Sequence, residues 1–61
     1  MIFRIYWTKA GGHIHMRFFA GKQEGALGKC GDLCMRSYEF DEFRARAEKA
    51  EMLIDFREEQ A

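Results

Sequence analysis

The sequence predicts an α+β fold in which one helix packs on one face of a three- or four-stranded antiparallel sheet, with the elements in the order β-β-β-α-β. Two segments in which polar and apolar residues alternate, Ile2 to Thr8 and His13 to Ala20, predict the first two strands. A stripe of apolar residues at helical spacing after Ser37 predicts the helix. The 61 residues, none of them proline, are expected to form a single domain, 1–61.

The first two predicted strands are expected to form a hairpin, because Gly11 and Gly12 stand between them. Only a loop of two or four residues keeps the apolar side chains of both strands on one face, since an odd loop length would place apolar residues opposite polar ones. We expect the four-residue turn Lys9-Ala10-Gly11-Gly12. The predicted pairs are Thr8 with His13, Tyr6 with His15, and Arg4 with Arg17.

A third strand is predicted over Lys29 to Arg36, after a polar loop from Gly21 to Leu27 that contains two glycines. Its apolar residues Leu33 and Met35 alternate with polar ones, so we expect them on the same face as the apolar residues of the hairpin. The residues expected on the opposite face are Asp32, Cys34 and Arg36.

The helix is predicted over Tyr38 to Ala50, with Ser37 as its N-cap. Acidic side chains gather near its start and basic ones follow, which is the order that the helix dipole favours. The apolar stripe that faces the sheet consists of Phe40, Phe43, Ala47 and Ala50.

The segment from Met52 to Arg57 fits two patterns, because its apolar residues alternate as in a strand while Ile54 also continues the helical stripe. We favour a short final strand, since aromatic and β-branched residues become more frequent and an uninterrupted helix would expose Leu53 or Phe56. The predicted core consists of Phe3, Ile5, Trp7, Ile14, Met16, Phe18, Leu33, Met35, Phe40, Phe43, Ala47 and Ala50.

Charge and length exclude several classes of function. The 10 basic and 10 acidic side chains cancel, which removes the argument for a strongly basic nucleic-acid-binding protein. A chain of this length buries only about 60% of the surface that its unfolded form exposes, so we expect no enclosed active site and no enzyme activity. No apolar run approaches the ~20 residues that cross a bilayer, and no export signal is recognised. We therefore expect a cytoplasmic protein with free thiols.

Four side chains of zinc-ligand types, His13, His15, Cys30 and Cys34, are predicted on one side of the sheet. Along an extended strand the two cysteines lie about 13 Å apart, whereas two thiolates on one zinc ion are at most about 4.6 Å apart. Only a bulge at Gly31 would bring them closer. We therefore expect no bound metal.

Two further motifs are incomplete. His13-Ile14-His15 has the His-hydrophobe-His form of the metal-binding strand in rolling-circle replication nucleases, but the larger domain and the tyrosine on a later helix are missing. The glycine-rich run 25–31 lacks the Lys-Ser/Thr ending of a phosphate-binding loop. We therefore expect neither catalytic residues nor a cofactor.

The sheet face opposite the predicted helix, here called the open face, carries basic and aromatic residues on neighbouring strands. Tyrosine, arginine and phenylalanine are typical of protein interfaces, and basic residues among aromatic ones also resemble surfaces that bind single-stranded nucleic acid. We favour a protein partner and keep single-stranded nucleic acid as the alternative. Because no second helix covers this face, we expect a homodimer or a host-protein complex to use it. The candidate partner-binding residues are Arg4, Tyr6, His13, His15, Arg17 and Phe19.

The runs Ile5 to Phe19 (IYWTKAGGHIHMRFF) and Gly28 to Leu33 (GKCGDL), with the helix start Glu39 to Phe43 (EFDEF), resemble small accessory proteins encoded by tailed bacteriophages and prophages. The resemblance covers most of the chain. It implies a protein in the cytoplasm of an infected bacterium that binds and inhibits or modulates a host protein, in the manner of anti-CRISPR and other anti-defence inhibitors. It implies no catalytic residue.

Overall fold

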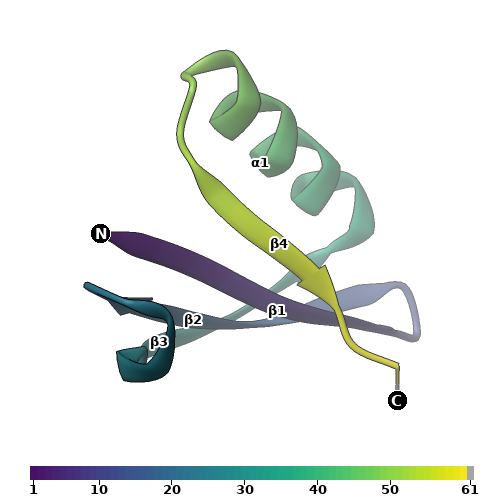
Figure 1. Ribbon diagram of the computed structural model, residues 1–61. Helices are drawn as coiled ribbons and strands as arrows, with labels where there is room; N and C mark the ends of the chain where they lie inside the picture. Colours follow the sequence, from purple (N-terminus) through teal and green to yellow (C-terminus); the bar gives the residue numbers. More distant parts are fainter. Residues whose placement is uncertain (61) are drawn as a thin grey trace.

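Residues 1–60, which the computed structural model describes, form four strands, one α-helix and one short 3₁₀-helix (Figure 1). In chain order the elements are β1 (Ile2–Ala10), β2 (His13–Gly21), η1 (Glu24–Ala26), β3 (Gly28–Arg36), α1 (Ser37–Lys49) and β4 (Ile54–Glu58). The strands form one sheet in the order β3-β2-β1-β4, and α1 covers one of its faces. The predicted α+β fold with the element order β-β-β-α-β is confirmed.

The β1–β2 hairpin closes on a two-residue turn, Gly11-Gly12, with Ala10 opposite His13. Both glycines have positive φ angles, 58° and 80°, as in the type I′ turns whose twist matches that of the flanking strands. The predicted four-residue turn is therefore wrong by two residues in register. The observed pairs include Thr8 with His15, Tyr6 with Arg17, and Arg4 with Phe19. A shift of two residues leaves every side chain on its predicted face, so the amphipathic pattern is preserved.

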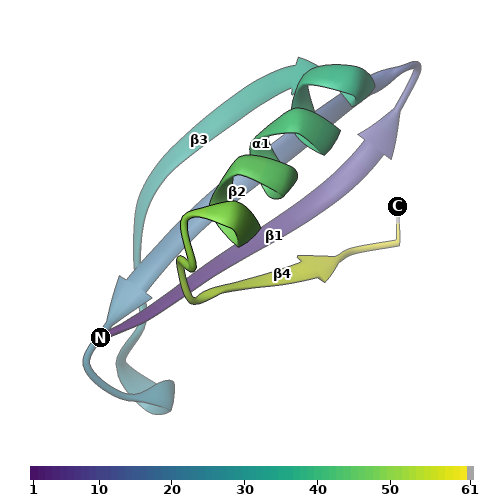
Figure 2. The same cartoon turned by 90° about the horizontal axis from the view of Figure 1, so that it is seen from above.

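The last strand, β4, lies beside β1 and runs parallel to it, with Phe3 opposite Ile54 and Ile5 opposite Phe56. A strand within Met52 to Arg57 is thus confirmed, but the sheet is mixed rather than wholly antiparallel. The reason is the crossover: α1 carries the chain back across the sheet toward the end where β3 begins (Figure 2). Since β1 and β3 both pair antiparallel with β2, the strand after this crossover runs parallel to both.

The helix α1 begins at Ser37, one residue before the predicted start. Arg36 is the N-cap, and its backbone N–H donates to Glu39 Oε1 at 3.1 Å. Ser37, predicted as the N-cap, instead donates its backbone N–H and its hydroxyl to the carbonyl oxygen of Gly12, each at 3.2 Å. These bonds fasten the start of α1 to the tip of the β1–β2 hairpin.

The core lies between α1 and the sheet. Its buried apolar residues are Ile5, Ile14, Met16, Phe40 and Ala47. Partly buried side chains pack around them: Trp7, Phe18, Met35, Phe43, Ile54 and Phe56. Three members of the predicted core are exposed instead, namely Phe3, Leu33 and Ala50. Seen from above, α1 lies over β1 and β2, so the edge strand β3 and the start of β1 extend beyond its cover (Figure 2).

Candidate functional site

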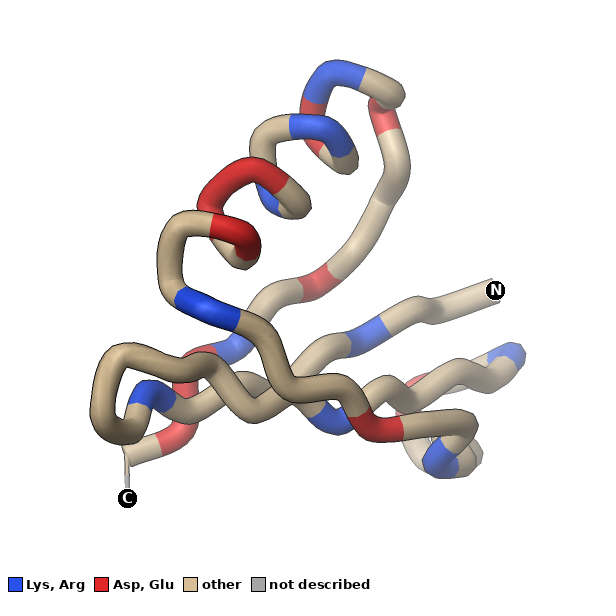
Figure 3. Tube along the Cα trace, turned by 180° about the vertical axis from the view of Figure 1, so that it is seen from behind, with Lys and Arg blue, Asp and Glu red and all other residues tan. Residues whose placement is uncertain are grey.

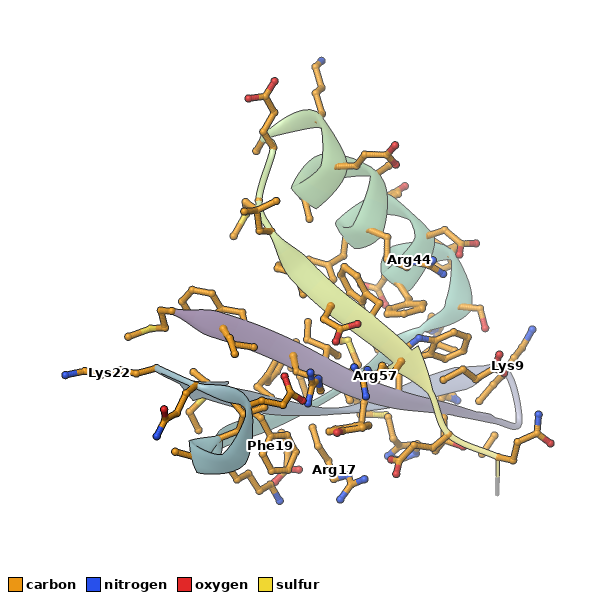
Figure 4. The ribbon with its side chains drawn as sticks, viewed as in Figure 1. Lys9, Arg17, Phe19, Lys22, Arg44 and Arg57 are labelled. Carbon is orange, nitrogen blue, oxygen red and sulfur yellow. The ribbon has the colours of Figure 1, made fainter. Side chains whose placement is uncertain are left out.

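The six residues predicted to bind a partner all come from β1 and β2, and the register places them on the open face. Figure 4 shows Arg17 and Phe19 on the side of the sheet away from α1. The six do not form one uniform surface. The part of the open face over β1 and β4 is closed by ion pairs, whereas the part over β2 and β3 is exposed.

Arg4 is the most buried of these residues, with only 6% of its surface exposed. Its Nε donates to Asp55 Oδ2 at 2.9 Å, and a terminal nitrogen pairs with Glu24 Oε1 at 2.5 Å. The two carboxylates raise the pKa of Arg4, and the guanidinium lowers the pKa of both Glu24 and Asp55, chiefly through these hydrogen bonds. The guanidinium therefore joins β1 to β4 and η1, and it is not free to bind a partner.

Three of the predicted residues form a cluster at the centre of the open face. The rings of Tyr6 and Phe19 meet edge to face, with 5.4 Å between centroids. The guanidinium of Arg17 lies over both rings, 5.5 Å from the Tyr6 centroid and 5.8 Å from that of Phe19, and also pairs with Glu59. Arg17 stays half exposed, so this cluster remains accessible.

The two histidines lie on the exposed part of the open face, over β2 and β3. His15 stands opposite Cys34 on β3, with 3.8 Å between Nε2 and Sγ, and His13 stands opposite Arg36. A shallow depression runs along this part of the face, lined by His15, Arg17, Asp32 and Cys34 together with Met16 and Leu33.

The four zinc-type side chains do not come together. The register between β2 and β3 shifts between Phe18 and Phe19, which pair with Gly31 and Lys29 and leave Cys30 as the extra residue of a bulge. Cys30 lines a groove on the α1 side of the sheet, while Cys34 stays on the open face beside His15. Both thiols are free. Within residues 1–60 no group of three or more His, Cys, Asp or Glu side chains is placed to hold a metal ion.

A second candidate surface lies on the α1 side of the sheet, where the chain enters β1 and β4. We call it the apolar patch, and its residues are Met1, Phe3, Met52 and Leu53, all exposed. Leu53 is 91% exposed. An apolar groove of about 190 Å³ opens beside it between α1 and the sheet, lined by Phe3, Arg4, Ile5, Phe18, Phe19, Cys30, Phe43 and Ile54. The patch and the groove share Phe3 and Ile54.

One feature of the sequence indicates this patch, although the prediction of the final strand did not consider it. Met52, Leu53 and Ile54 are three consecutive apolar residues. Successive side chains of a strand point to opposite faces, so one face of a sheet cannot bury all three. The backbone of Ile54 continues into β4, which leaves the two preceding side chains in the α1–β4 connection without cover.

The Arg4 ion pairs predict a specific dependence of stability on pH. Glu24 and Asp55 have ordinary pKa values of 4.5 and 3.8, and both are lowered in the folded chain. Their contribution to the free energy of unfolding is therefore complete above about pH 4.5 and is lost as the pH falls through the lowered values. We expect Arg4→Met to reduce the urea midpoint at neutral pH and to flatten its decline in acid.

Urea unfolding between about pH 2 and about pH 7 measures both effects. Arg46→Met is the matched control, because Arg46 is an exposed arginine whose nearest carboxylate oxygen, on Glu42, lies 3.9 Å away. If the urea midpoints of Arg4→Met and Arg46→Met depend on pH in the same way, the Arg4 ion pairs do not cause the pH dependence of stability.

Comparison with known proteins gave no match to a family model, to a curated protein or to a solved structure. In the described part of the chain, no helix is long and apolar enough to span a membrane.

Proposed function

We propose that this chain is a small protein-binding domain that docks on another protein through the apolar patch. The observation that carries the proposal is the continuity of four exposed apolar side chains with an apolar groove. Contiguous exposed apolar surface is uncommon on soluble domains and marks interaction sites. Burying a side chain such as Leu53 contributes about 1.5–3 kcal/mol, so a partner that covers the patch gains a strong central anchor.

The partner that fits this surface is a protein that offers an apolar side chain to the groove and an apolar surface to Met52 and Leu53. Two flexible methionines, Met1 and Met52, border the patch, and such side chains adapt to irregular partner surfaces. The resemblance to phage accessory proteins adds that the partner belongs to the bacterial host and is inhibited or modulated in the host cytoplasm.

Charge supports a protein partner over single-stranded nucleic acid. On the open face Arg17 pairs with Glu59, Arg57 with Asp55 and Lys29 with Asp32. A phosphate backbone would have to displace these carboxylates before it gained the cations. In the described chain Lys and Arg are spread over the strands, the connections and the helix, with Asp and Glu among them on β3, α1 and β4, rather than gathered in one large basic region (Figure 3).

Affinity capture with matched variants tests the proposal. The tagged protein is incubated with bacterial lysate, with and without nuclease, and retained proteins are identified by mass spectrometry. We expect at least one protein to be retained after nuclease treatment and to be lost with Leu53→Asp. Tyr38→Asp is the control, because Tyr38 is also a large exposed side chain, 60% exposed, and lies on α1 outside the patch.

Three outcomes are informative. Retention by Tyr38→Asp but not by Leu53→Asp supports docking through the apolar patch. Loss of every partner after nuclease treatment overturns the protein-binding proposal in favour of nucleic acid. Retention by Leu53→Asp with loss in Arg17→Glu moves the binding surface to the Tyr6–Arg17–Phe19 cluster of the open face.

A further inference from the structure

We propose that the partner protein binds in part through an extended segment, which continues from the apolar patch along the free edge of β4 and adds to the sheet antiparallel to β4. The inference rests on the proposed function, because it specifies which part of the partner is bound. The sheet order leaves β4 at an edge. Seen from above, α1 lies over β1 and β2 and leaves the outer side of β4 uncovered (Figure 2). An uncovered edge strand is a template with which another chain can pair.

One hydrogen bond identifies which backbone groups of β4 point to the free edge. Glu59, which directly follows β4, donates its N–H to the carbonyl oxygen of Trp7 on β1 at 2.7 Å. Backbone groups alternate in direction along a strand, so those of Arg57 also point to β1. The N–H and C=O groups of Phe56 and Glu58 therefore point to the free edge. None of the turn and side-chain hydrogen bonds of residues 1–60 occupies them.

The free row of backbone groups is short. It begins at the carbonyl of Ile54, because the N–H of Ile54 already donates to the carbonyl of Met52 at 3.0 Å. It ends at Glu58, the last residue of β4. A row of this length accommodates only a few residues of an added strand, so the side chains beside the edge must supply the specificity.

A groove between α1 and β4, here called the edge groove, lies beside this row. It has a volume of about 240 Å³. No described residue of β1 lines it, and β4 is the edge strand, so the groove opens toward the free edge. It also shares Met52 and Ile54 with the surface of the apolar patch. The lining residues are Arg44, Ala47, Glu48, Met52, Ile54 and Phe56.

Arg44 provides the charge of the edge groove. Its guanidinium carbon lies 5.4 Å from the ring centroids of Phe40 and Phe56 and 5.9 Å from that of Trp7. These cation–π contacts hold the guanidinium beside the ring of Phe56. No carboxylate of residues 1–60 forms an ion pair with Arg44. A carboxylate of the partner can therefore bind this guanidinium without displacing another one.

The edge groove favours a particular residue pattern in the added strand. The residues opposite Phe56 and Ile54 face the groove, and they are two positions apart. The residue opposite Phe56 meets Arg44, so an acidic side chain fits there. The residue opposite Ile54 meets Met52, which favours an apolar side chain, and Glu48 lies one helical turn after Arg44 and disfavours a second carboxylate. Because the two strands run in opposite directions, the acidic residue comes two positions before the apolar one.

Selection from a displayed library of short random peptides tests this pattern on the intact chain. We expect the selected peptides to share an acidic residue two positions before an apolar one. Selection on Arg44→Glu should instead yield lysine or arginine at the acidic position. Arg46→Glu is the control and should retain the acidic residue, because Arg46 lies on the same helix, is 83% exposed and does not line the edge groove. Circular dichroism establishes that both variants are folded.

Amide hydrogen exchange followed by NMR tests the strand pairing. In the free chain the N–H groups of Phe56 and Glu58 should exchange faster than those of Arg57 and Glu59, and a selected peptide should slow the exchange at Phe56 and Glu58. N-methylation of the peptide at its acidic residue should weaken binding at least about tenfold, because that N–H donates to the Phe56 carbonyl. N-methylation of the next peptide residue is the control, since its N–H points away from β4.

Three results would each overturn the added strand: selected peptides without the acidic residue at this spacing, a pattern that Arg44→Glu leaves unchanged, or bound peptides that protect no amide of β4. The proposed function is tested separately, by capture of a protein through Leu53. A protein partner that is lost with Leu53→Asp, combined with any of these three results, would overturn the added strand and leave docking through the apolar patch intact.

Discussion

Replacing Phe40 with alanine is expected to remove a large part of the stability of the domain. Phe40 is 2% exposed and is the largest fully buried side chain, with its ring centroid 4.9 Å from Trp7 and 6.1 Å from Phe56. Removing a buried phenylalanine side chain costs about 3–5 kcal/mol. A domain of this size has a total free energy of unfolding of about 3–9 kcal/mol at the usual value per residue, so the loss consumes most of it.

Urea unfolding followed by circular dichroism measures this effect. Tyr38→Ala is the matched control, because it removes an aromatic side chain from the same helix at an exposed position. We expect Tyr38→Ala to unfold close to the wild-type midpoint. Similar midpoints for Phe40→Ala and the wild type would show that α1 packs on the sheet through another face.

The second large effect is expected at Gly21, the last residue of β2. A Cβ atom there would stand 2.3 Å from the carbonyl oxygen of Ala26 in η1. Backbone atoms cannot yield as a flexible side chain does, so Gly21→Ala should displace η1 and draw Glu24 away from Arg4. We expect the free energy of unfolding to fall by about 1–3 kcal/mol, the usual cost of overpacking.

Gly25→Ala is the control, because a Cβ atom at Gly25 meets nothing within 4 Å. Thermal unfolding of the two variants should separate them clearly, with the Gly25→Ala transition near that of the wild type. Coinciding transitions would mean that η1 does not pack against the end of β2.

The sequence was sufficient to predict the four strands and α1 because most of their signals are local, whereas the short helix η1 lies in the segment from Gly21 to Leu27 that was predicted as a loop. Alternation defined β1 and β2, and apolar spacing defined α1 within one residue at each end. The turn length was not determined, because loops of two and four residues preserve the same faces and only the positive φ angles of Gly11 and Gly12 distinguish them. The direction of β4 depends on which edge the crossover reaches, and no local pattern encodes that choice.

The sequence was sufficient to predict which residues lie on the open face, but not which of their charges are neutralised by ion pairs. Alternation correctly placed Tyr6, Arg17 and Phe19 together. One of the two carboxylate partners of Arg4, however, is Asp55, 51 residues away along the chain. Such a pair forms only once β4 lies beside β1, so a residue that the sequence presents as a free cation is neutralised by the fold.

The most direct test of protein docking through the apolar patch is the dissociation constant of the partner captured after nuclease treatment. It is measured with wild type, Leu53→Asp and Arg17→Glu at low and at high salt. Docking through the patch predicts that Leu53→Asp weakens binding at least about 30-fold, as expected for a central anchor worth about 2 kcal/mol. It also predicts that Arg17→Glu changes the dissociation constant little and that the dissociation constant depends only weakly on salt. Docking through the patch would be contradicted if Leu53→Asp bound the partner as tightly as the wild type does. In that case we would expect affinity to fall steeply in Arg17→Glu and as the salt concentration rises.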